Sequence, residues 1–180
     1  MVTDLLDRLC GRLREAHELS PGVLLGVDGP DGAGKTTLAD ALAERMTALR
    51  TSIDDFHRPA ADRVTLRTFD LSTDMATDRH AITVGHRDVL IVDGVFLLRP
   101  ELADLWTVSV YLRISPEESL RRALIRDVDL FGSAEQVRAR YLTRYLPGQA
   151  IYRAEADPES MADIVVDNER ADEPHILRWT

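Results

Sequence analysis

The sequence is poor in cysteine, lysine, asparagine and long apolar runs. A single cysteine, Cys10, cannot form an internal disulfide, which favours a reducing compartment such as the cytoplasm. No apolar run approaches the roughly 20 residues that cross a bilayer. The acidic, amphipathic start lacks the pattern of a signal peptide. These absences predict a cytoplasmic protein with no membrane partner.

An excess of positive charge is also missing. The formal net charge is −9, whereas a general nucleic-acid binder needs a basic face that displaces counterions from phosphates. We therefore expect no nucleic-acid partner. At 180 residues the chain is long enough for one α/β domain and short for two, so residues 1–180 are predicted to form a single domain.

Lysine occurs once, as Lys35, among 22 basic side chains that are otherwise all arginine. It lies in Gly29-Pro30-Asp31-Gly32-Ala33-Gly34-Lys35-Thr36, which fits the phosphate-binding P-loop pattern G-x-x-x-x-G-K-[ST]. An apolar run at 23–27 precedes it and a helical pattern at 37–43 follows, which is the strand–loop–helix order that the motif requires. The pattern predicts a nucleoside triphosphate site, taken as an ATP site with GTP left open, and contacted by Gly29, Asp31, Gly32, Ala33, Gly34, Lys35, Thr36 and Thr37.

Scarce amide residues exclude one class of P-loop protein. Guanine-specific switches usually read their base with Asn-Lys-x-Asp, and the only asparagine here, Asn168, has no lysine beside it. The only glutamines, Gln136 and Gln149, are far from the P-loop in sequence, so no water-orienting residue of a hydrolytic switch is evident. A regulatory NTPase is therefore the weaker alternative.

Strand and helix patterns alternate along most of the chain. Residues 4–18 are predicted to form an amphipathic helix, and the P-loop helix is predicted to run to about Leu49. Strands are predicted at 51–54, 89–92, 108–114 and 162–166, of which 89–92 and 108–114 are continuous apolar runs. Further helices are expected at 116–127, where Ser115-Pro116-Glu117-Glu118 marks a helix start, and at 134–146 and 149–156. A loop is expected at 129–133, a break at Pro147-Gly148 and a hairpin within 64–84. This order predicts an α/β fold, a parallel sheet with helices on both faces and a small helical lid over about 117–146.

Two acidic residues end predicted strands at the edge where ligands bind in such sheets. Asp93 closes the run 89–92 and, with Thr36 and Asp54, is a candidate ligand or water-mediated ligand of Mg²⁺. Asp54 closes the second strand and is the candidate base that accepts a hydroxyl proton. The alternative for both is an ordinary strand-end turn residue.

Arginines on the later helices are candidates for neutralising phosphate charge. Arg122 and Arg126 are four residues apart and share one helix face, although an ordinary solvated face is the alternative. For Arg138, Arg140 and Arg144 taken singly, the solvated face is favoured. Acceptor contacts are predicted at His57, Arg58 and Arg140.

These segments together resemble the uridine kinase-like family of P-loop kinases. The resemblance covers residues 22–168 and rests on the P-loop, Ser52-Ile53-Asp54-Asp55-Phe56-His57, 90–98 with Asp93-Gly94, and the late Arg122-to-Asp127 motif. It implies a nucleoside-monophosphate-kinase-like fold and transfer of the ATP γ-phosphate to a hydroxyl, typically the 5′-OH of uridine or cytidine. It also implies that Asp54 is the general base, that Asp93 stands where an acid, usually Glu, lies near the metal, and that Arg122 and Arg126 are lid residues.

The sequence departs from this family in the region that normally builds the acceptor pocket. Only residues 55–92 separate Asp54 from Asp93, a stretch substantially shorter than in the family's nucleoside kinases. The small-molecule acceptor therefore stays open between a pyrimidine nucleoside and another hydroxyl metabolite. A nucleotide-binding module without catalysis is a further alternative. The resemblance leaves a homo-oligomer open, but no sequence feature marks an interface.

Overall fold

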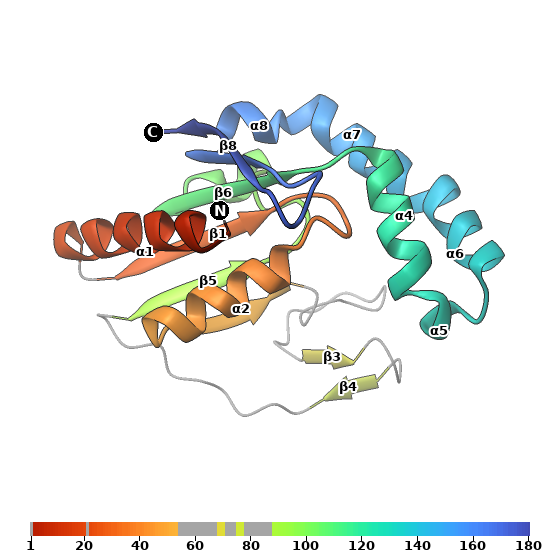
Figure 1. Ribbon diagram of the computed structural model, residues 1–180, viewed down its shortest axis with the longest axis horizontal. Coiled ribbons are helices and arrows are strands. Elements are labelled where there is room, and N and C mark those ends of the chain that lie inside the picture. The colour runs from red at the N-terminus through yellow and green to blue at the C-terminus, as the bar shows by residue number, and fades with distance from the viewer. Residues whose placement is uncertain (1, 21, 54–67, 71–74, 78–87) are drawn as a thin grey trace.

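The computed structural model describes residues 2–20, 22–53, 68–70, 75–77 and 88–180 (Figure 1). Six strands form one sheet in the order β2-β5-β1-β6-β7-β8. Their bounds are β1 Val23–Asp28, β2 Leu49–Ser52, β5 Val89–Asp93, β6 Val108–Arg113, β7 Ile164–Asp167 and β8 His175–Trp179. All neighbours are parallel except β7 and β8, which are antiparallel, so the predicted parallel sheet gains one antiparallel edge strand.

Helices cover both faces of this sheet, because apolar side chains of its central strands alternate between the faces. On β6, Val110 and Leu112 pack in the larger core with helices α1 (Val2–Leu19) and α2 (Lys35–Met46). Tyr111 points to the other face and packs with Leu98 and Val165, against helix α7 (Leu146–Ala156). Figure 1 shows α1 and α2 together in front of the sheet. The fold is a mostly parallel α/β sandwich, as the alternating sequence pattern predicted.

A group of short helices lies beyond the carboxyl ends of the strands (Figure 1). It comprises α4 (Pro116–Arg126), α5 (Val128–Phe131), α6 (Ala134–Arg140) and a π-helical segment, Tyr141–Tyr145. We call these helices the lid. Ser115 caps α4 by accepting a hydrogen bond from the Glu118 amide at 3.1 Å, as the Ser-Pro-Glu-Glu pattern indicates. Ala123, Val137 and Tyr141 give the lid a small core of its own.

Two predictions of local structure were wrong, and the second strand, predicted at 51–54, is Leu49–Ser52 and so ends before Asp54. The segment 129–133 was expected as a loop, but Val128–Phe131 is a helical turn that ends at Gly132 in a left-handed conformation (φ 87°). The predicted break at Pro147-Gly148 does not occur, because α6, the π-helical segment and α7 follow one another without interruption. Pro147 lies inside this continuous stretch, just after the π-helical segment, so its missing N–H removes one helical hydrogen bond without ending the helix. Strand β8 was not foreseen.

The remaining short elements complete the description. They are β3 (Thr68–Asp70), which pairs antiparallel with β4 (Met75–Thr77), and the helices α3 (Pro100–Ala103) and α8 (Pro158–Met161). The P-loop helix α2 ends at Met46, before the predicted Leu49, because Thr47 takes a left-handed conformation (φ 53°). Among the described helices, none combines the length and apolarity needed to cross a membrane.

Candidate active site

The P-loop connects the end of β1 to the start of α2 and is shaped by glycine. Gly29 has φ 150°, and a Cβ there would lie 2.5 Å from the Leu112 carbonyl oxygen, so no side chain fits. Gly34 caps α2 in a left-handed conformation (φ 90°), and within the described part of the chain no side-chain capping hydrogen bond forms at the helix N-terminus. This is the arrangement that binds phosphate oxygens.

Five successive carbonyls of this loop each accept a hydrogen bond from a side chain. The ammonium of Lys35 donates to the carbonyls of residues 29 and 30, and three donors from distant segments bind the carbonyls of residues 31, 32 and 33. The bonds are Lys35 Nζ to Gly29 O (2.9 Å) and Pro30 O (2.8 Å), Ser119 Oγ to Asp31 O (2.7 Å), Arg122 Nη1 to Gly32 O (2.9 Å) and Asn168 Nδ2 to Ala33 O (2.8 Å). With its carbonyls held by the protein, the loop offers mainly N–H dipoles to an anion.

Arg122 is the central brace of this loop. Besides Gly32, its guanidinium donates to Glu118 Oε1 (2.6 Å), to Asn168 O (2.7 Å) and to Glu169 O (3.0 Å). All three guanidinium nitrogens thus donate to protein groups. The Glu118 carboxylate is hydrogen-bonded by Arg121 and Arg122, which lowers its pKa to about 2. In the structure, Arg122 fastens α4 and the segment after β7 to the P-loop, a role that sequence reasoning did not foresee.

Replacing Arg122 with methionine is expected to lower the free energy of unfolding by about 2–3 kcal/mol, because it leaves several partly buried acceptors unpaired. ATP affinity should fall as well, since the loop loses its brace. Urea unfolding and calorimetric titration measure the two effects. The matched control is Arg121→Met, which removes the neighbouring, largely exposed arginine that also binds Glu118 and should change stability by less than about 1 kcal/mol. Equal effects of both variants would contradict the bracing role.

The structure brings Thr36 and Asp93 together at the carboxyl end of β5. The Thr36 hydroxyl donates to Asp93 Oδ2 at 2.8 Å, and Asp93 is 1 % exposed. The other oxygen, Asp93 Oδ1, is buried with no hydrogen bond from the described residues, although Arg50 Nη2 lies 2.6 Å away. A hydroxyl and a carboxylate are the hard oxygen donors that Mg²⁺ prefers beside nucleotide phosphates. The residues present therefore fit a magnesium site, for which Thr36 and Asp93 are candidate ligands.

Asp28, at the end of β1, is a site residue that sequence reasoning missed. It is fully buried, accepts hydrogen bonds from the amides of Gly29 (2.6 Å) and Leu98 (3.0 Å), and also accepts one from the Tyr152 hydroxyl. Burial raises the pKa of Asp28. Its contacts fix the turn into the P-loop and tie it to α7. A carboxylate that closes an apolar run directly before a P-loop was the signal that could have identified it.

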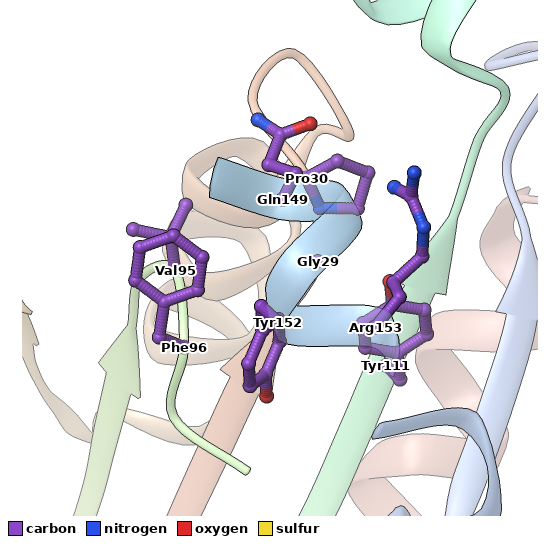
Figure 2. Close-up of a pocket in the computed structure, with 8 residues that line it drawn as sticks. All are labelled: Gly29, Pro30, Val95, Phe96, Tyr111, Gln149, Tyr152 and Arg153. Carbon is purple, nitrogen blue, oxygen red and sulfur yellow. The ribbon is translucent and has the colours of Figure 1, made fainter. Parts of the chain in front are cut away.

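A small cavity of about 10 Å³ lies beside the P-loop, with room for about one water molecule (Figure 2). It is lined by Gly29, Pro30, Val95, Phe96, Tyr111, Gln149, Tyr152 and Arg153. Phe96 has a positive φ of 64°, unusual for an aromatic residue. Gln149 Nε2 lies 3.3 Å from Asp31 Oδ2, while its Oε1 is buried without a hydrogen bond from any described residue. Gln149, distant in sequence, thus reaches the P-loop in space.

The predicted lid arginines differ in where they lie. Arg126 donates to both carboxylate oxygens of Asp127 (2.6 and 2.9 Å) and to the Tyr141 hydroxyl (3.2 Å). Its pKa is raised chiefly by the Asp127 hydrogen bond, with smaller contributions from Tyr141 and from Asp31 of the P-loop. Arg140 stacks on the Phe131 ring at 4.6 Å, within the lid. In the described contacts, Arg126 and Arg140 therefore bind residues of the lid itself.

Other predicted site residues are placed as follows. Asp54, His57 and Arg58 lie outside the described residues, so their predicted roles as base and acceptor contacts stay predictions. The backbone carbonyl of Asp31 accepts a hydrogen bond from the Ser119 hydroxyl, and its carboxylate accepts one from the side-chain amide of Gln149. Thr36 and Thr37 are exposed in the first turn of α2, and Lys35 is 8 % exposed. The site as described consists of the braced loop, the lone lysine and the Thr36–Asp93 pair.

Comparison with known proteins supports the fold. No known family model matches the sequence. The guanylate kinase of Thiobacillus denitrificans is 32 % identical over 122 residues, which are 68 % of this chain and 54 % of that protein. The chain therefore spans about half the length of this curated relative.

Solved structures match over nearly their whole length. A protein of Silicibacter sp. TM1040 described as a putative fructose transport system kinase has a TM-score of 0.67 at 23 % identity, covering 84 % of this chain and 95 % of that one. A possible uridine kinase from Bacillus stearothermophilus has a TM-score of 0.64 at 20 % identity, covering 91 % and 98 %. The YGR205w protein has a TM-score of 0.65 at 17 % identity, covering 99 % and 97 %. The chain has the P-loop kinase fold.

Proposed function

We propose that the protein is a small-molecule kinase, which transfers the γ-phosphoryl group of ATP to a hydroxyl of a small metabolite. The observation that carries the proposal is the P-loop whose five carbonyls are held by side chains, with Lys35 and the Thr36–Asp93 pair beside it. The same combination of a phosphate cradle, a lone ammonium and hard oxygen donors is what phosphoryl transfer requires. Kinase names among the similar proteins agree with this proposal.

Each residue of the site has a role in positioning or charge. Lys35 would leave the carbonyls of Gly29 and Pro30 and bind the β- and γ-phosphates. Thr36 and Asp93 would hold Mg²⁺, which neutralises charge on those phosphates when bound. Asp54 would accept the proton of the acceptor hydroxyl. Arg126 would neutralise phosphate charge when the lid closes, and Arg122 contributes by keeping the loop in shape.

The lead acceptor in this proposal is a pyrimidine nucleoside, and another small hydroxyl metabolite is the alternative. The uridine kinase among the structural neighbours supports the former, and the guanylate kinase relative adds a nucleoside monophosphate as a competing acceptor. We further propose that residues 1–180 act as one domain in the cytoplasm, on small molecules and not on nucleic acid. The net charge of −9 and the single buried cysteine support this setting.

A panel of acceptors tests the proposal. Purified protein with Mg·ATP should phosphorylate at least one hydroxyl acceptor in a set containing uridine, cytidine, other nucleosides, pantothenate and sugars, and GMP is included as the phosphate acceptor for comparison. Mass spectrometry of the product identifies the acceptor, and a coupled assay measures ADP. UMP or CMP as product would support the lead acceptor, whereas GDP from GMP would favour a nucleotide kinase. ADP release that no acceptor stimulates, with no phosphorylated product, would contradict the proposal and favour a regulatory NTPase.

A further inference from the structure

An ion pair between the buried Asp93 and the partly exposed Arg50 joins the candidate metal position to the neighbouring edge strand. Arg50, on β2, places Nη2 at 2.6 Å from Asp93 Oδ1, and the Asp93 side chain is 2 % exposed. The two strands are parallel neighbours, with Ser52 in register with Asp93. The long arginine side chain thus reaches along the sheet to the carboxylate that ends β5. No step proposed above uses this arginine.

Arg50 is shared between two carboxylates of different exposure. Its Nε lies 3.4 Å from Asp40 Oδ1 on α2, and the Asp40 side chain is 61 % exposed. Neither Arg50 Nε nor Asp93 Oδ1 makes a hydrogen bond with good geometry among the described residues, although both atoms are buried. Arg50 and Asp93 are therefore held together by charge, while the Nε of Arg50 and the Oδ1 of Asp93 remain without a well-formed hydrogen bond among the described residues. Such a contact is easier to exchange than a bidentate arginine–carboxylate bond.

Both oxygens of Asp93 already face a partner. Oδ2 accepts the Thr36 hydroxyl at 2.8 Å and Oδ1 faces the Arg50 guanidinium at 2.6 Å. A divalent cation between Thr36 and Asp93 would stand close to the positive charge of Arg50, and like charges at such separations repel strongly when partly buried. The cation and the guanidinium therefore compete for one carboxylate.

We propose that Arg50 is the resident counter-ion of Asp93 and lowers the affinity of this site for a divalent cation. This inference rests on the metal role proposed above for Thr36 and Asp93. When a cation occupies the site, Arg50 gives up Asp93 Oδ1 and keeps Asp40. Arg50 is thus a positioning residue: it holds the carboxylate in place and sets how strongly the site takes metal.

The test is a titration of the full chain with Mn²⁺, without nucleotide or acceptor. Binding is measured from the electron paramagnetic resonance signal of the Mn²⁺ that stays free. Arg50→Met keeps an unbranched side chain but removes the charge, and it should tighten Mn²⁺ binding by on the order of tenfold. Arg50→Lys keeps the charge and should bind Mn²⁺ about as weakly as the unmodified protein. The control Arg45→Met removes an exposed arginine that pairs with Asp7, and it should leave Mn²⁺ binding unchanged.

Two further variants locate the effect. The double variant Arg50→Met with Asp93→Asn should not show the tighter Mn²⁺ binding of Arg50→Met, because the carboxylate that binds the cation is then absent. Asp40→Asn removes the second partner of Arg50, so the arginine should hold Asp93 more strongly and weaken Mn²⁺ binding about twofold. If Arg50→Met does not fold, as judged by circular dichroism, Asp40→Asn and Arg50→Lys decide the question.

The outcomes are separable from those of the acceptor panel. A folded Arg50→Met protein with unchanged, weaker or no measurable Mn²⁺ binding would overturn the inference, as would a gain that survives Asp93→Asn. Tighter Mn²⁺ binding that depends on Asp93 would support it even if no acceptor is phosphorylated. If only the acceptor panel fails, the inference about Arg50 still holds. If only the Mn²⁺ experiment fails, the proposed kinase activity still holds.

Discussion

Replacing Lys35 with alanine is expected to reduce phosphoryl transfer by at least about 10²–10³-fold and to weaken ATP binding about 10–100-fold. Lys35 is the only lysine in the chain and is 8 % exposed, with its ammonium on two P-loop carbonyls. When ATP binds, the Lys35 ammonium is the compact charge that can bridge its β- and γ-phosphates, and alanine supplies neither the charge nor the N–H donors. Isothermal titration with ATP and single-turnover transfer to the best acceptor measure the two losses.

A second substitution separates charge from geometry at the same position. Lys35→Arg keeps a positive charge but replaces a point ammonium with a planar fork, so most of the activity should still be lost. Thermal denaturation of both variants checks that they fold, since removing Lys35 takes the ammonium hydrogen bond from Gly29 O and leaves Pro30 O with the Ala33 amide. A folded Lys35→Ala protein with unaltered ATP affinity would show that the triphosphate binds elsewhere.

Local patterns were enough to predict the part of the fold that carries the P-loop. The amphipathic helix predicted over 4–18 is α1, and the runs at 89–92 and 108–114 are the central strands β5 and β6. Burial and alternation are properties of neighbouring residues, so a short window of sequence contains them. Ser115-Pro116 likewise predicted the start of α4, because a helix cap depends on residues three apart. The α/β fold followed from the order of these elements.

Contacts between distant residues could not be predicted in the same way. Asn168 and Ala33 are 135 positions apart, and Arg122 and Gly32 are 90 apart, yet both pairs hold the P-loop. Nothing in their local sequence marks them, because the parallel sheet brings their strand and helix ends to one edge. The sequence predicted that Arg122 contacts a phosphate, because it shares a helix face with Arg126. In the structure its guanidinium nitrogens donate to protein groups. The acceptor contacts His57 and Arg58, outside the described residues, stay predictions.

The continuation from the lid into α7 was mispredicted because two local signals pointed the wrong way. Pro147 and Gly148 together favour a break in isolation. In the structure a π-helical segment, Tyr141–Tyr145, precedes them, and Pro147 falls in the first turn that follows. The consequence for the site is direct, since this continuous helix places Gln149 and Tyr152 against the P-loop.

Asp54→Asn is expected to lower the turnover number by about 10²–10⁴-fold and to leave ATP affinity unchanged. Asparagine keeps the size of aspartate but cannot accept the proton of the acceptor hydroxyl. Turnover with the best acceptor and ATP affinity by titration are measured on the same preparation.

The neighbouring carboxylate supplies the matched control for this prediction. The alternating pattern predicted from the sequence puts the Asp55 side chain on the face opposite to Asp54, so Asp55→Asn is expected to change turnover by less than about tenfold. The pH profile adds an independent readout: if Asp54 is the base, the acidic limb of the turnover profile should disappear in Asp54→Asn and persist in Asp55→Asn. Unchanged turnover in Asp54→Asn, or a larger loss in Asp55→Asn, would move the base to another residue while leaving the phosphate site of Lys35 intact.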